Sequence, residues 1–414
     1  MLRRRPRLIA RLRALLGPDT AAARQSLVAL SLNSSTSLVA GAVLGSITAT
    51  FAKFPGLLVL VPAAIGLRGN IFGSFGNRIS TTIHAGTFRM STRPETVLGQ
   101  NVLAASSLTL VMSVVLAIVA KAVAVALGLS DTASILTLAT ISVIGGVLAS
   151  VVVLAATLGL SGGAVRYGWD LDNVNAPLVS TLGDVITLPA LWIATFAAGL
   201  GLVTSSLGLA FVGAAVAALV VTWRSRLEEL RRIVRESLPV LIVAGTVSAM
   251  AGIVLEGRFS SFDRYPALLV LVPAHLSSAG ALGGILSGRL SSKLVLGIVP
   301  SRATPSREAR LDIALVLLLA VPVYVFNAIG AQVVARLLGE ASPGIGEMLA
   351  VSLSGGLLAM ALVVVIAYYG SIASVRAGVD PDTYGIPVVS STVDFVGAFT
   401  LTVAIATLGL TAAT

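Results

Sequence analysis

Two aspartates inside apolar segments are the residues of this chain best suited to chemistry. Asp184 and Asp394 each stand seven residues after a proline that opens a hydrophobic stretch. A carboxylate in a membrane is costly, so such a residue usually marks an ion path or a proton relay. Two carboxylates held close together repel unless a proton or a cation neutralises them, and a divalent cation balances both charges. The pair therefore predicts a metal site formed by Asp184 and Asp394.

The hydroxyl residues three and four positions before each aspartate share its helix face. We expect them to line the same ion path. The alternative is that each aspartate caps a neighbouring helix or pairs with Arg68. The path-lining candidates of these two segments are Ser180, Thr181, Ser390 and Ser391.

Four further acids precede the two segments on the expected cytoplasmic side. They could gather cations at the inner mouth of the path, or they could be solvated loop residues, and the sequence leaves both interpretations open. The four acids are Asp170, Asp172, Asp380 and Asp382.

A second repeated feature is a pair of prolines seven residues apart, Pro55 and Pro62, which recurs 211 residues later as Pro266 and Pro273. Small residues at four-residue spacing follow each pair. Such spacing lets helices approach closely and exposes backbone carbonyls. Plain helix packing is one interpretation, and recurrence in both halves favours a second, that these residues line a pore. The pore-lining candidates are Gly69, Asn70, Gly73, Gly280 and Gly284.

Composition defines the class of protein. Hydrophobic residues make up 56% and charged residues 11%, and the mean hydropathy is +0.98, so we expect an all-α polytopic membrane protein. The net charge of +10 does not indicate nucleic-acid binding, because the basic residues fall in short loops between apolar stretches. Without cysteine, the chain has no disulfide and no thiolate metal site.

The chain contains eleven stretches of a length that spans a bilayer. The first five match the last five, and the sixth has no counterpart. Because five is odd, one added crossing gives the two five-helix units the same orientation, so we expect parallel repeats. The stretches are residues 27–51, 55–76, 99–127, 133–161, 176–202, 205–222, 238–256, 265–287, 311–337, 346–374 and 386–411.

These spans divide the chain into four parts. A basic amphipathic N-terminal segment on the cytoplasmic membrane face (1–23) precedes the first repeat (24–204). A linking span with a helical cytoplasmic connector at 223–236 (205–236 in all) leads to the second repeat (237–414). Most basic loop residues lie on one side of this arrangement, which predicts a cytoplasmic N-terminus and an external C-terminus in the plasma membrane.

The segment from Pro55 to Gly86, with its run Leu67-Arg68-Gly69-Asn70, resembles the membrane domain of MgtE-type magnesium transporters, as does the run Ser-Ser-Thr-Val-Asp394. The two-copy form is most similar to the eukaryotic solute-carrier branch of that family. The resemblance implies that Asp184 and Asp394 contact hydrated Mg²⁺ in the ion path. It also implies that one chain supplies a whole pore, since single-repeat members are homodimers. The second half departs from the pattern, with Ala281 in place of Asn70.

We therefore expect a transporter or channel that moves Mg²⁺ or another divalent cation across the lipid bilayer, with no permanently bound cofactor. A proton- or sodium-coupled carrier of another cation or small solute is the alternative. A membrane enzyme is disfavoured, because the sequence shows no nucleophile with an adjacent base and no metal-binding histidine cluster at membrane depth.

Overall fold

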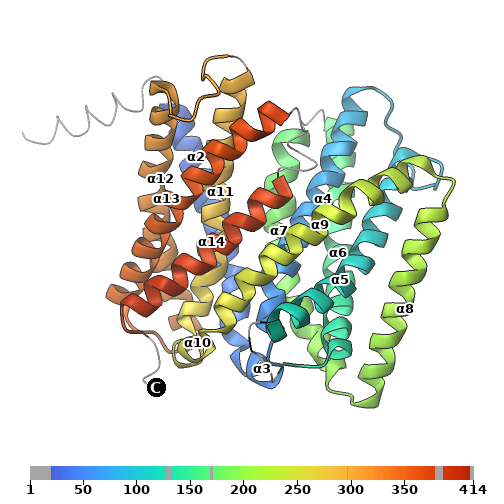
Figure 1. The fold of residues 1–414 in the computed structure, drawn as a ribbon, viewed down its shortest axis with the longest axis horizontal. Coiled ribbons are helices and arrows are strands. Elements are labelled where there is room, and N and C mark those ends of the chain that lie inside the picture. Colours follow the sequence, from blue (N-terminus) through green and yellow to red (C-terminus); the bar gives the residue numbers. More distant parts are fainter. Residues whose placement is uncertain are drawn as a thin grey trace, which may run out of the picture.

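The computed structural model describes residues 20–126, 128, 132–167, 171–295, 297–377 and 386–410. These residues form helices joined by short connections, without a strand among them. Eleven of the helices in this described part are long and apolar enough to cross a membrane. The expected all-α polytopic membrane architecture is confirmed (Figure 1).

Each half of the chain contributes five long helices and one short one. The first half consists of α2 (Thr20–Ser46), α3 (Thr48–Lys53), α4 (Leu57–His84), α5 (Val97–Ala126), α6 (Ile135–Tyr167) and α7 (Leu171–Ala198). The second consists of α9 (Glu228–Glu256), α10 (Phe259–Arg264), α11 (Ala267–Val295), α12 (Arg307–Leu338), α13 (Ile345–Ala377) and α14 (Ile386–Thr407). Between them lies α8 (Leu202–Arg224).

The short helices α3 and α10 show that the halves are repeats with the same direction. Both their first and their last residues are 211 positions apart. Both lie at the lower end of the molecule in Figure 1, and α4 and α11 rise from that end. After these second spans the chain turns at Gly86 and Gly297, with φ of 68° and 70°, a left-handed conformation that glycine adopts without strain.

The unmatched helix α8 packs against α5, α6 and α9 at one edge of the bundle (Figure 1). The charged run expected as a connector at 223–236 is helical over most of its length. Helix α8 ends at Arg224 and α9 begins at Glu228, so residues 228–236 continue into the next apolar helix without a break. The run is amphipathic, and Leu230, Ile233 and Val234 are buried on its apolar face.

The first span of each half packs against the other half. Helix α2 lies against α11 and α12, and α9 lies against α4 and α5. A methyl group on Gly41 would overlap the backbone of Val270, and one on Gly252 would overlap the backbone of Val59. These two contacts are equivalent, because both partners shift by 211 positions. The halves are therefore interlocked by two close helix crossings of the kind that small residues permit.

Candidate functional site

The two aspartates lie where the halves meet. Asp184 is on α7 and Asp394 is on α14, and the carboxylates are close enough for the charge of Asp184 to act on Asp394. Both residues are half-buried. The structure thus brings together the two acids that the repeat pattern singled out.

Asp184 faces polar side chains from two other helices. The Ser277 hydroxyl of α11 lies 3.5 Å from Asp184 Oδ2 and 3.1 Å from Asn33 Oδ1 of α2. One hydroxyl proton serves only one acceptor at a time, so the contact with Asp184 is a long and shared one. The Ser37 hydroxyl also lies beside Asp184, without hydrogen-bond geometry. Asp184 therefore sits among oxygen atoms from both halves.

Asp394 occupies the equivalent place but has a less polar environment. A methyl group on Gly66 of α4 would lie 3.6 Å from Asp394 Oδ2 and 3.7 Å from Ser248 Oγ of α9. Gly66 is the counterpart of Ser277, and Ser37 is the counterpart of Ser248, each displaced by 211. Each aspartate therefore faces the second span of the other half and the first span of its own.

The glycines expected in the pore border open space. A methyl group added at Gly69, Gly73, Gly280 or Gly284 would meet no atom of a neighbouring element within 4 Å. Glycines that serve helix packing behave differently here, since a methyl group on Gly145 would collide with Leu191. Close packing therefore does not account for these four residues on α4 and α11.

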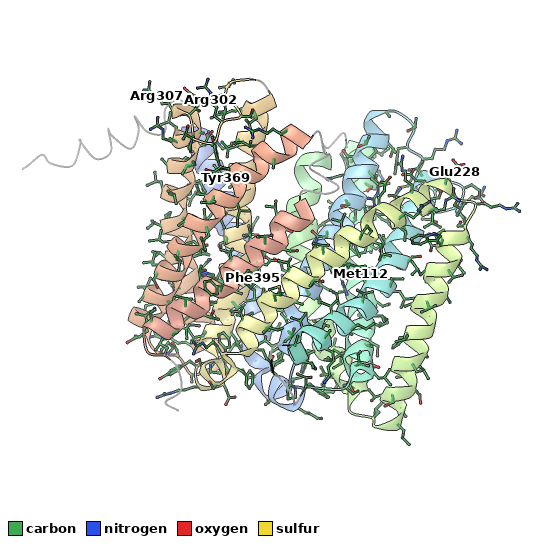
Figure 2. All side chains as sticks on the ribbon, viewed as in Figure 1. Met112, Glu228, Arg302, Arg307, Tyr369 and Phe395 are labelled. Carbon is green, nitrogen blue, oxygen red and sulfur yellow. The ribbon has the colours of Figure 1, made fainter. Side chains whose placement is uncertain are left out.

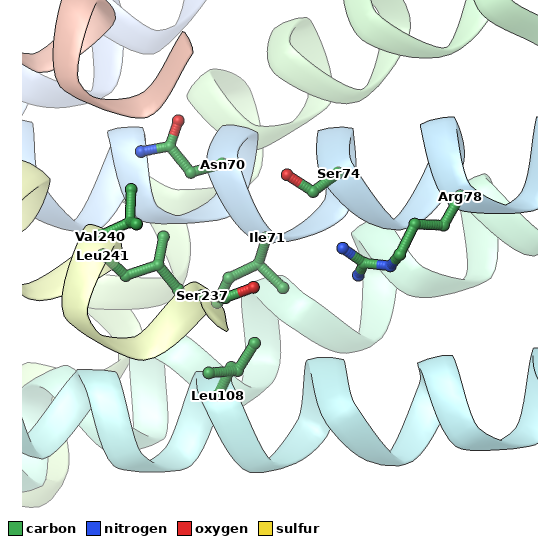
Figure 3. Close-up of a pocket in the computed structure, with 8 residues that line it drawn as sticks. All are labelled: Asn70, Ile71, Ser74, Arg78, Leu108, Ser237, Val240 and Leu241. Carbon is green, nitrogen blue, oxygen red and sulfur yellow. The ribbon is translucent and has the colours of Figure 1, made fainter. Parts of the chain in front are cut away.

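Asn70 lines a small cavity between α4, α5 and α9, shown in Figure 3. Ser74, Arg78 and Ser237 contribute its other polar groups. The cavity measures ≈ 10 Å³, about the room that one water molecule needs. The Arg78 Nε atom donates to Asn101 Oδ1 over 2.7 Å, which fixes the guanidinium at the end of this cavity.

The remaining predicted residues differ in where they lie. Thr181 and Ser390 are half-buried, whereas Ser391 is fully buried in the packing around α14. Ser180 and Asp172 are on α7, but the structure does not describe their side chains. The other inner-mouth acids, Asp170, Asp380 and Asp382, lie outside the described residues.

Arg68 does not neutralise the aspartates. Its guanidinium is buried and points to Gly146 of α6 and Ser113 of α5, and it forms no ion pair with any residue that the structure describes. The alternative in which Arg68 pairs with Asp184 is therefore wrong. In the second half Ala279 replaces this arginine, and the ring of Tyr324 packs at Gly356, the counterpart of Gly146.

The described residues contain no group of three or more histidine, cysteine, aspartate or glutamate side chains able to hold a metal. Two carboxylates with hydroxyl and amide oxygens around them suit a cation that keeps much of its water shell, as Mg²⁺ does. The sequence had not indicated Asn33, Ser37, Ser248 or Ser277. Ser37 and Ser248 do repeat at the 211-residue displacement and could have been found from it.

An all-α membrane protein with two parallel repeats and an acid from each at their junction belongs to the class of repeat-built transporters. The family model named MgtE, described as a divalent cation transporter, matches residues 61–194 and 272–404, once in each half. The chain belongs to the MgtE family.

Curated relatives come from the solute carrier family 41. Member 3 from Rattus norvegicus is 25% identical over 253 residues, covering 59% of this chain and 53% of its own. Member 2 from Xenopus laevis is 26% identical over 263 residues (60% and 45%), and member 2 from Homo sapiens is 27% identical over 262 (60% and 44%). The chain spans about half the length of these relatives. No solved structure matches the chain.

Proposed function

We propose that this protein carries hydrated Mg²⁺ across the membrane through a path between its two halves. The observation that carries the proposal is that each carboxylate faces the second span of the other half, Asp184 at Ser277 of α11 and Asp394 at Gly66 of α4. The matching family is described as a divalent cation transporter, which supports the same class of cargo.

The charge of the site favours a divalent ion. Asp184 and Asp394 together carry two negative charges, which a single Mg²⁺ balances, whereas a monovalent ion leaves one uncompensated. Mg²⁺ gives up its water reluctantly and is commonly held by one or two carboxylates through the water that it keeps. In this proposal the open space that borders the glycines of α4 and α11 holds that water shell.

One chain supplies the whole path in this proposal, because both carboxylates and both glycine-bearing helices come from the same polypeptide. The proposed setting is the plasma membrane, with the N-terminus inside and the C-terminus outside. Arg302 and Arg307 lie at the same end of the molecule as Glu228, the start of α9 (Figure 2). That end is the cytoplasmic one in this orientation, which follows from the tendency of basic loops to stay inside.

Flux into proteoliposomes tests the proposal. The full chain is reconstituted with a Mg²⁺-sensitive dye inside, and Mg²⁺, Mn²⁺, Co²⁺, Zn²⁺ and Ca²⁺ are offered in turn, with and without a proton or sodium gradient. We expect saturable Mg²⁺ entry that exceeds entry into liposomes holding the Asp184→Asn, Asp394→Asn double variant. Equal flux in the two preparations, or uptake of an organic solute without cation entry, would contradict the proposal.

A further inference from the structure

The two aspartates have unequal surroundings. Around Asp184, the Ser37 hydroxyl of α2 and the Ser277 hydroxyl of α11 lie beside the carboxylate, and Asn33 of α2 accepts a hydrogen bond from Ser277. At the equivalent positions around Asp394 the chain has Ala244, Ser248 and Gly66, so only one hydroxyl is present. The pseudo-symmetry of the fold is broken at the site itself.

The polar groups around Asp184 have unused hydrogen-bonding capacity. The Asn33 Nδ2 atom and the Ser37 Oγ atom are buried, and neither has a hydrogen-bond partner among the described residues. Buried polar atoms are almost always hydrogen-bonded in native proteins. The Ser37 hydroxyl beside Asp184 can therefore accept a hydrogen bond from a polar ligand that completes this site when it is occupied, whereas Asn33 Nδ2 is a donor and reaches the site only through Ser277.

The chemistry of that ligand follows from the oxygen atoms present. Water bound to a cation directs its hydrogens outward, so the shell of a hydrated ion needs hydrogen-bond acceptors. The Asn33 carboxamide oxygen, the two serine hydroxyls and the Asp184 carboxylate are all acceptors. At the equivalent positions around Asp394, Ser248 offers an acceptor, whereas Ala244 and Gly66 have no side-chain oxygen.

We propose that the transported cation rests off the pseudo-two-fold axis, nearer Asp184, and that Asn33, Ser37 and Ser277 are positioning residues that hold Asp184 and the water shell of the ion. Asp394 then acts mainly through its charge. This inference rests on the proposed function, because it takes the aspartates to be the ion site.

Variants that copy one half onto the other test this inference. Ser277→Gly and Asn33→Ala give Asp184 the surroundings of Asp394, and Mg²⁺ binding to the purified full chain is measured by calorimetry. Because each change removes a side-chain oxygen that can accept a hydrogen bond from the water shell of the ion, we expect each change to weaken apparent Mg²⁺ affinity roughly fivefold to tenfold. Ser35→Ala, at an exposed position of α2, is the matched control and should bind as the wild type does.

A pair of double-mutant cycles separates positioning from general damage. Ser277→Gly should cost little affinity once Asp184 is asparagine, because the charge that Ser277 helps to hold is gone, but should keep its full cost when Asp394 is asparagine. Asp184→Asn should also weaken binding more than Asp394→Asn does. Ser277→Ala provides a second truncation, and unfolding temperatures measured without Mg²⁺ establish that each variant is folded.

The outcomes distinguish the two levels of the proposal. Equal coupling of Ser277 to both aspartates, or unchanged affinity in both Ser277→Gly and Asn33→Ala while the aspartate variants lose binding, would overturn the off-axis site alone. Wild-type affinity in Asp184→Asn and Asp394→Asn would instead overturn the proposed ion site on which it rests.

Discussion

An arginine that recurs in both halves has a different partner in each. Arg289 donates through Nε to Asp312 Oδ1 over 2.8 Å, and Lys293 reaches Asp312 Oδ2 over 2.6 Å. In the first half the equivalent Arg78 meets the neutral Asn101. Asp312 is only 2% exposed, and both of its carboxylate oxygens contact a cation. Two residue differences, Asp312 for Asn101 and Lys293 for Thr82, thus give the second half an ion-pair network in place of the Arg78–Asn101 hydrogen bond.

Replacing Asp312 with asparagine should destabilise the second half. Arg289 and Lys293 would keep a hydrogen-bond acceptor but lose the charge that balances them. Because both cations are partly exposed, we expect a loss of about 2 kcal/mol, below the usual cost of breaking a fully buried pair. Thermal unfolding in detergent measures it. The reverse change, Asn101→Asp, should not destabilise the protein, and an unaltered unfolding temperature in Asp312→Asn would contradict this account.

At the residue scale the sequence was informative where a residue type was out of place. Asp184 and Asp394 could be predicted because an acid in an apolar span is rare, and because it occurs twice. Ser277 and Asn33 could not, since their counterparts are Gly66 and Ala244 and repeat comparison gave no signal. A serine among apolar residues is also common in membrane helices, where it often serves packing.

At the scale of helices, the glycines of α11 should be required for flux rather than for folding. Gly284→Leu places a large side chain where no atom lies within 4 Å of the position. We expect the rate of Mg²⁺ flux to fall at least tenfold while the unfolding temperature stays within a degree or two of the wild-type value. Gly213→Leu on α8, also in open space, is the control. Normal flux in Gly284→Leu would show that the glycines of α11 lie outside the ion path.

The interlocked first spans predict the opposite behaviour for Gly41. An alanine there would overlap the backbone of Val270, so α2 has to move away from α11. Overpacking of this kind typically costs 1–3 kcal/mol, so we expect an unfolding free energy about 2 kcal/mol lower. Gly252→Ala should cost a similar amount, because Val59 lies in the equivalent place, while Gly213→Ala should cost almost nothing. A tolerated alanine at both crossings would contradict the close approach.

The sequence predicted the membrane spans better than it predicted which helices pack against each other. Length and hydropathy predicted eleven spans, since both are local properties. The start of α9 was placed too late, because its charged first turns were taken for a connector. The sequence did not predict that α2 packs against the second half and α9 against the first. Hydropathy records that a helix face is apolar, and it does not record which helix covers that face.

At the scale of the whole molecule, the extra helix α8 predicts the orientation of both halves. With the N-terminus inside, the loop between α11 and α12 is cytoplasmic and the loop between α12 and α13 is external. The chain has no cysteine, so single cysteines at Ser301 and Ala341, one in each loop and both exposed, report these sides. A membrane-impermeant maleimide should label Ala341→Cys in intact cells, and Ser301→Cys only after permeabilisation. Labelling of both in intact cells would contradict the topology.

The most direct test of the central claim is Mg²⁺ flux through proteoliposomes that contain Asp184→Asn, Asp394→Asn or both changes. Asparagine removes the charge with little change in volume, so the fold should be retained. We predict that each single variant loses most of the Mg²⁺ flux. The double variant should have little less flux than the single variant that retains less, because both acids serve one ion. Near-normal flux in both single variants would show that the two aspartates do not form the ion site.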